Sequence, residues 1–154
     1  SRDNVWVADW RNDRIQRFTA DGEFVSSFGE SGEGDGQFLS SRGIVVDRSG
    51  QVHVVDMRNQ RVQVFDAGWN FQASLRGQAT VSPWAQEYLE ANADELDARS
   101  RFNPYIEVDT DVPHEVSARV EAFFWDPIAV EIDPDGRLIV ADSLRHRLQV
   151  YKRA

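Results

Sequence analysis

The chain repeats one phrase three times, and this repetition restricts the possible folds more than any other feature of the sequence. The copies are VWVADWRNDRIQRF from Val5, VHVVDMRNQRVQVF from Val52 and LIVADSLRHRLQVY from Leu138. In each copy an alternating apolar run ends on an aspartate, and an arginine five residues later opens a second run. Alternation with a period of two predicts β-strands. Self-similar units predict a repeat architecture, in which each sheet is buried against its neighbours.

Segments on both sides extend the phrase to a four-stranded unit. Residues 43–47 and 128–132 precede the turns RSGQ and PDGR and are predicted to be first strands. Residues 24–28 and 71–75 follow the turns ADGE and AGWN and are predicted to be fourth strands. The first repeated aspartate precedes the second by 47 residues, a spacing typical of β-propeller blades. The second precedes the third by 86 residues, so about 39 residues are inserted between them.

The repeated units resemble NHL repeats. The family pattern is an alternating strand closing in VAD, then N-x-R-[IV]-Q-V-[FY], a DxxG turn and a Gly-rich GxxGxGxGQF linker. The segment from Val5 to Phe38 follows this pattern through FGESGEGDGQF. The resemblance covers residues 5–79 and 127–154. It implies a β-propeller, usually of six blades, which serves most often as a binding platform and sometimes as a lyase or lactonase scaffold.

The predicted fold class is all-β: an incomplete propeller of NHL type with about three four-stranded blades and a mainly helical insert. Ten blade strands are expected, because the first blade lacks its inner strand and the third its outer strand. Open sheet edges favour pairing with another chain. We therefore expect a second copy, closing a six-bladed ring, or the rest of a longer propeller. The predicted units are 1–38 (partial blade and linker), 39–79 (complete blade), 80–126 (acidic insert) and 127–154 (partial blade).

The insert at residues 80–126 carries most of the negative charge. It holds eleven carboxylates and three arginines, in a chain of formal net charge −9. Ser82 as N-cap and Pro83 as first helical residue predict a helix ending near Ala91, and a second short helical turn is expected in residues 94–101. Residues 102–113 are predicted to be extended.

We expect the aromatic side of the insert to pack on the blades or across a subunit interface, with its acidic side in water. Such an insert emerges on the same face as the loops that follow the repeated aspartates. It would therefore cover a site, contact a neighbouring subunit or pack over the blades. Val116, Val120, Phe123 and Phe124 recur at helical spacing, and the aromatic side consists of Trp84, Tyr88, Phe123, Phe124 and Trp125.

Two sets of side chains recur around the loops. The repeated aspartate and arginine are expected to form a bidentate pair that fixes the loop between them, which is a structural role. These pairs are Asp9 with Arg14, Asp56 with Arg61, and Asp142 with Arg147. Aromatic, methionine and arginine side chains on one rim are the types enriched at binding hot spots. The candidate ligand-binding residues are Trp10, Arg11, Arg42, Met57, Arg58 and Arg145.

The sequence offers no recognisable catalytic constellation. It contains no cysteine, which excludes disulfides, thiolate zinc sites and a cysteine nucleophile. In the lyases of this superfamily three histidines directly precede inner strands, whereas here Arg42 and Asp126 hold the matching places. His53, His114 and His146 lie elsewhere in the repeat. We therefore predict no catalytic residue, no metal and no cofactor.

The expected function is a non-enzymatic binding or scaffold module that engages a protein or small ligand on the loop face. The alternative is a metal-dependent hydrolase or lyase of the gluconolactonase-like propeller kind, for which the inner strands offer Asp47, Glu131 and Asp133. The Gly-rich stretch at 29–36 lacks the ending of a P-loop and carries three carboxylates, which argues against phosphate binding. The acidic net charge argues against nucleic acid. No run is long and apolar enough for a membrane span.

Overall fold

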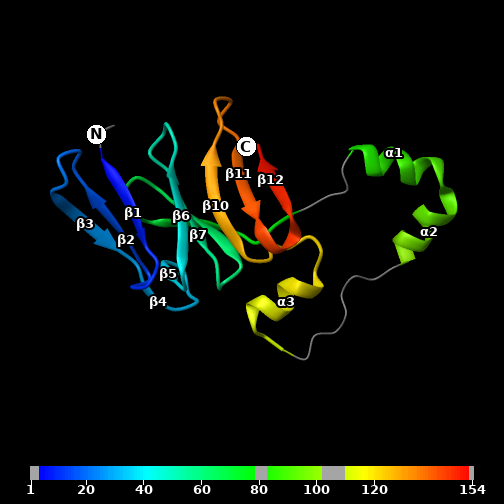
Figure 1. The fold of residues 1–154 in the computed structure, drawn as a ribbon, viewed down its shortest axis with the longest axis horizontal. Coiled ribbons are helices and arrows are strands. Elements are labelled where there is room, and N and C mark those ends of the chain that lie inside the picture. Colours follow the sequence, from blue (N-terminus) through cyan, green and yellow to red (C-terminus); the bar gives the residue numbers. More distant parts are fainter. Residues whose placement is uncertain (1–3, 79–82, 102–109, 153–154) are drawn as a thin grey trace.

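The computed structural model describes residues 4–78, 83–101 and 110–152, and its main strands form three antiparallel sheets side by side in chain order (Figure 1). The first sheet consists of β1 (Val5–Asp9), β2 (Arg14–Phe18) and β3 (Phe24–Phe28). The second consists of β6 (Ser41–Val46), β7 (Val52–Asp56), β8 (Arg61–Phe65) and β9 (Phe71–Leu75). The third consists of β10 (Pro127–Ile132), β11 (Leu138–Asp142) and β12 (Arg147–Tyr151).

This architecture confirms the predicted all-β propeller class with three blades. The repeat aligns β1 with β7 and β11, so the described residues give the first sheet no counterpart of inner strand β6, and the third sheet no counterpart of outer strand β9. The ten predicted strands are present. Two more, β4 (Glu30–Ser31) and β5 (Gln37–Phe38), pair in parallel inside the Gly-rich linker. They were missed because two residues are too few to show an alternating pattern.

Aspartates close three of the strand-connecting turns. Oδ1 of Asp47 accepts the backbone N–H groups of Ser49 and Gln51 at 2.8 and 2.9 Å. Asp66 and Asp133 make the same pair of bonds to the residues two and four positions further on. Such side-chain-to-backbone bonds fix a turn. Each turn therefore sets the register of the two strands that it joins.

The core consists of two hydrophobic clusters, one between each pair of neighbouring sheets. Alternate residues of β7 face opposite neighbours: Val52 and Val54 contribute to the cluster with the first sheet, and Val55 to the cluster with the third. A linker contributes one fully buried aromatic ring to each cluster. These rings are Phe38 and Phe124. Burying such a side chain stabilises the fold by about 1.5–3 kcal/mol, so the linkers are part of the core.

The insert divides into two differently placed parts. α1 (Pro83–Ala91) and α2 (Ala93–Arg101) confirm the two predicted helices, and they lie away from the sheets (Figure 1). α3 (Pro113–Arg119) lies beside the sheets, at the end where β4 and β5 are found (Figure 1). Ser82 and residues 102–109 fall outside the described residues. Within the described part of the chain, no helix is long and apolar enough to cross a membrane.

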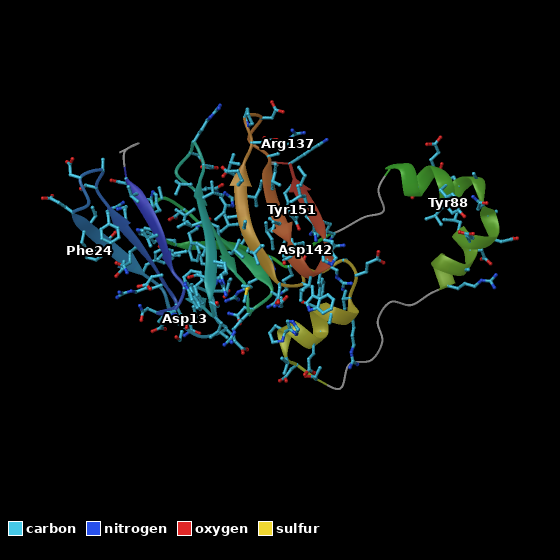
Figure 2. The ribbon with its side chains drawn as sticks, viewed as in Figure 1. Asp13, Phe24, Tyr88, Arg137, Asp142 and Tyr151 are labelled. Carbon is cyan, nitrogen blue, oxygen red and sulfur yellow. The ribbon has the colours of Figure 1, made fainter. Side chains whose placement is uncertain are left out.

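Packing of the insert's aromatic side on the blades is confirmed for Phe124, whereas Tyr88 lies on α1, away from the sheets (Figure 2), and its packing across a subunit interface stays a prediction. Phe124 is fully buried between the second and third sheets. Tyr88 is 46% exposed, and its hydroxyl donates to Glu95 on α2 (Figure 2). The side chain of Trp84 is outside the described part. The expected helical spacing ends at Val120, which is extended and caps α3, because the chain then turns so that Phe124 enters the core.

Candidate functional site

The loops that follow the repeated aspartates lie at one end of the sheets, which we call the loop face; the opposite end is the turn face. Figure 2 shows Asp142 at the loop face of the third sheet and Arg137 at its turn face. The linker that enters β6 and the loop between β7 and β8 touch here, because the backbone N–H of Arg58 donates to the carbonyl of Leu39 at 3.1 Å. The loop face is therefore built jointly by loops and linkers.

Asp56 is the centre of a buried hydrogen-bond network in the second sheet. Its Oδ2 accepts the Nε–H of Arg61 at 2.7 Å, and the two side chains are 0% and 3% exposed. The amide groups of Asn59 and Gln63 also donate to Oδ2. Oδ1 accepts the backbone N–H of Leu39 at 2.7 Å. The pair therefore fixes both its own loop and the incoming linker. The predicted bidentate geometry is wrong, because only Nε of Arg61 contacts the carboxylate and its Nη2 group donates to linker carbonyls instead.

Arg61 extends this network into the Gly-rich linker. Its guanidinium donates to the carbonyls of Gly34 and Gln37 at 2.7 and 3.0 Å. Burial raises the pKa of Asp56 above its ordinary value, against the hydrogen bonds from Leu39, Asn59 and Arg61 that lower it. An arginine paired with a carboxylate and two carbonyls has most of its donors occupied. We therefore assign this pair no ligand-binding role.

The third sheet contains the same Asp–Arg network as the second sheet, and the first sheet contains part of it. Asp142 accepts from Arg147 at 2.7 Å and from the backbone N–H of Trp125, while Arg147 donates to the carbonyl of Phe123. Asp9 accepts from Arg14 at 2.9 Å, but this pair is more exposed. The Arg14 side chain, together with those of Asn12 and Gln16, lowers the pKa of Asp9.

The candidate ligand residues separate into two groups. Trp10 is exposed in the loop between β1 and β2, and the guanidinium carbons of Arg11 and Arg42 lie 5.0 and 4.6 Å from the centre of its ring. Arg58 is exposed on the neighbouring loop. We call these four residues the rim cluster. Arg11, Arg42 and Arg58 form no ion pair with any other described residue.

Arg145 and Met57 are less accessible to a ligand than the residues of the rim cluster. The guanidinium of Arg145 donates to the carbonyls of Ser117, Ala118 and Val120 at the end of α3, and it stacks on Trp125. Arg145 therefore holds α3 on the loop face of the third sheet. Met57 is half-buried, and its carbonyl accepts from Gln60.

The three histidines lie on separate elements. His53 is buried in β7, His114 is on α3, where it accepts the indole N–H of Trp125 at 3.0 Å, and His146 is exposed before β12. In the described ranges, no three His, Cys, Asp or Glu side chains are grouped closely enough to hold a metal ion. The inner-strand carboxylates Asp47 and Asp133 belong to turns at the turn face.

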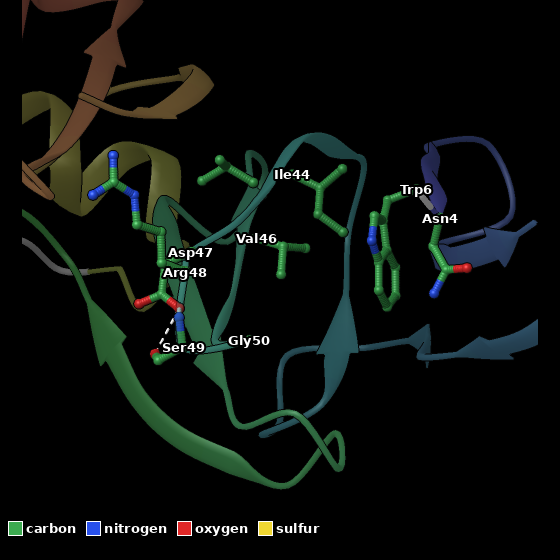
Figure 3. A pocket seen from close by; sticks show the side chains of 9 residues that line it. Asn4, Trp6, Ile44, Val46, Asp47, Arg48, Ser49 and Gly50 are labelled. Atoms are coloured by element: carbon green, nitrogen blue, oxygen red, sulfur yellow. Dashed lines mark hydrogen bonds between the residues drawn. The ribbon is translucent and has the colours of Figure 1, made fainter. Parts of the chain in front are cut away.

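A hollow of about 710 Å³ lies between the first and second sheets at the turn face (Figure 3). It is lined by Asn4 and Trp6, by residues 44–46 of β6 and by the turn 47–50. The Asp47 side chain in its wall is already bonded to Ser49 (Figure 3). None of the candidate ligand residues contributes to this hollow.

Sequence reasoning missed the contacts of the linkers and the role of a third repeated residue. Gln16, Gln63 and Gln149 each donate to the repeated aspartate of their own sheet. The sequence contains a signal for this role, because a glutamine follows every repeated arginine by two residues. The carbonyl partners in the linkers could not be found in the same way, since backbone groups leave no trace in the residue pattern.

Comparison with known proteins gives matches to family models and to curated proteins. The model described as 6-bladed beta-propeller matches residues 1–118, and the NHL repeat model matches residues 124–151. Protein lin-41 of Caenorhabditis elegans is 47% identical over 47 residues, which is 30% of this chain and 4% of that protein.

Similar solved structures include a protein of unknown function from Bacteroides thetaiotaomicron, with a TM-score of 0.56 and 18% identity over 94% of this chain and 31% of that one. A putative phosphatase from the same organism has a TM-score of 0.54 and 15% identity over 98% of this chain and 33% of that one. Streptogramin B lyase has a TM-score of 0.50 and 11% identity over 96% of this chain and 36% of that one. At these identities the likeness shows the fold alone, and the chain spans about a third of each of these structures.

Proposed function

Because the chain belongs to the 6-bladed β-propeller family, we propose that it is a non-enzymatic binding module whose loop face engages a protein or small ligand through the rim cluster. The observation that carries this proposal is the exposed ring of Trp10 beside the guanidinium groups of Arg11 and Arg42. Exposed tryptophan and arginine are the residue types that most often dominate binding energy.

The surroundings of the rim cluster support a preformed site. Asp13 in the same loop accepts the backbone N–H of Ser40 and the hydroxyl of Ser31 at 2.7 and 2.6 Å, so the linker before Arg42 is held against the loop of Trp10. The backbone N–H of Arg58 donates to Leu39 of the same linker, so the loop that carries Arg58 is also held against this linker. A preformed site loses less conformational entropy on binding than a flexible one.

The charge of the cluster favours an acidic partner. The whole chain carries a formal net charge of −9, so three arginines without described ion-pair partners form a local positive site on an acidic molecule. Such a site attracts carboxylates. Within the proposed class of protein ligands, we therefore expect acidic peptide segments to bind best.

A peptide-display selection on the purified protein tests this function. We expect enriched peptides to be acidic, and Trp10→Ala or Arg42→Ala to weaken their binding about 30-fold, the cost of losing a hot-spot contact. Arg48→Ala is the matched control, because Arg48 is an exposed arginine at the turn face and should leave affinity unchanged. Enriched peptides that bind Trp10→Ala as tightly as the parent would contradict the proposal.

A further inference from the structure

The third sheet exposes an apolar face whose counterpart in the second sheet is buried. The repeat aligns Leu148 and Val150 of β12 with Val62 and Val64 of β8. Val62 is 0% exposed because the third sheet covers it, whereas Leu148 is 66% exposed. Their neighbours show the same contrast, since Val64 is 8% exposed and Val150 is 53% exposed. The difference arises because the third sheet packs on this face of β8, whereas no sheet of the described residues packs on this face of β12.

The first sheet also exposes an apolar face, on the side that faces away from the second sheet. Val5 and Val7 of β1 align with Val52 and Val54 of β7. Val54 is 0% exposed, since the first sheet covers it, whereas Val7 is 40% exposed. The neighbouring residues Trp6 and Ala8 point the other way and pack against the second sheet. Within the described residues, the first and third sheets therefore each expose one apolar face, and these two bare faces differ in type.

The interface between the second and third sheets shows that these two types fit each other. On its second-sheet side lies Val62, the counterpart of Leu148, and on its third-sheet side lie Leu138 and Val140. Leu138 and Val140 are themselves the repeat counterparts of Val5 and Val7. The bare face of the third sheet thus matches the bare face of the first sheet, by the packing already present inside the chain.

We propose that a second copy of this chain covers both faces, with the β12 face of each copy packed on the β1 face of the other. Two copies with three blades each give the six blades that the family model describes. The contact is two-fold symmetric and closes, so association stops at two chains. Exposed Val5 and Val7 on the β1 face, and Leu148 and Val150 on the β12 face, supply the apolar area that drives it.

Cysteine cross-linking tests this contact directly, since the chain has no cysteine of its own. We expect the double variant Val7→Cys with Leu148→Cys to give covalent dimers with a short bismaleimide. The matched control pairs Val7→Cys with Leu96→Cys, because Leu96 is exposed to a similar degree as Val7 but lies on α2. That pair should give no dimer above background. Equal cross-linking of both pairs would show random collision and overturn the proposal.

Light scattering of the unmodified chain gives an independent result. We expect a mass of two chains of 17.6 kDa each, reduced to one chain by Leu148→Glu and unchanged by Leu96→Glu. Both positions are exposed within one chain, so neither substitution should prevent folding. A single-chain mass for the unmodified protein at micromolar concentration, or a dimer that survives Leu148→Glu, would overturn the proposal. Neither outcome bears on the rim cluster, which lies at the loop face.

Discussion

Arg61 and Arg14 occupy the same position of the repeat but differ in burial, and this difference predicts unequal effects of mutation. Arg61→Ala leaves the buried Asp56 carboxylate without its cation and removes the donor to Gly34. We expect a loss of roughly 3–5 kcal/mol in the free energy of unfolding. Arg14→Ala removes a more exposed pair and should cost less than about 1 kcal/mol. Urea denaturation measures both, and equal losses would contradict the structural assignment.

The hydrogen bonds of Asp133 predict how the stability of the fold depends on pH. The backbone N–H and the side chain of Arg137 lower the pKa of Asp133 from 3.8. The folded pKa is thus below the unfolded one, so the stabilisation is complete above pH 3.8 and is lost as the pH falls through the folded pKa. Asp133→Asn should therefore lower the melting temperature at about pH 6 and lower it less at about pH 3.

Asp21→Asn is the control for this measurement, since Asp21 is exposed and makes none of the turn hydrogen bonds seen for Asp133. Its substitution should leave the melting temperature nearly unchanged at both pH values. A loss from Asp133→Asn that is as large in acid as near neutrality would show that the carboxylate charge does not matter in this turn.

Among the elements, the junction between β9 and the returning insert depends on one glycine. Gly77 has a φ of +101°, and a Cβ there would lie 2.5 Å from the carbonyl oxygen of Ala122 and 2.6 Å from the backbone nitrogen of Phe124. Gly77→Ala would combine backbone strain with a clash against backbone, which we expect to cost at least about 1–3 kcal/mol. Gly22→Ala is the control, because it shares a positive φ but has open space around its Cβ.

The contrast between α1 and the blade strands predicts different rates of amide hydrogen exchange. α1 has exposed residues, including Tyr88, and packs chiefly against α2, whereas β7 is buried along its whole length. Elements with few buried contacts open at low free-energy cost. Amides in α1 should therefore exchange much faster than those in β7. Equal protection in mass-spectrometric exchange would show that α1 docks on another surface in solution.

The blade strands were predictable because alternation, turn residues and a threefold repeat all act over short distances in the sequence. The helices α1 and α2 were predictable for the same reason, from Pro83 and the residues that follow it. Their placement was not, because an aromatic such as Tyr88 shows a preference for burial but not which surface provides it. Among the candidate site residues, Trp10 lies beside Arg11 and Arg42, whereas the guanidinium of Arg145 is hydrogen-bonded to the end of α3. These hydrogen bonds of Arg145 go to backbone carbonyls 25 to 28 residues away in the sequence, so no local sequence pattern predicts them.

At the scale of the whole molecule, two surfaces have different proposed roles. The bare faces of the first and third sheets would complete the ring, and the loop face would bind the ligand. The buried pairs around Asp56 and Asp142 hold linkers and loops together between these surfaces. Substitutions at Leu148 should therefore change the mass in solution without changing peptide affinity for one chain.

Hydrogen exchange of the protein with a selected acidic peptide tests most directly whether the loop face is the binding face. We predict that saturating peptide slows exchange at residues 10–13, 39–42 and 57–60, which carry and adjoin the rim cluster. Exchange at residues 47–50 of the turn face should stay unchanged. Protection confined to residues 44–50 around the hollow, with the loop face unaffected, would contradict the central claim.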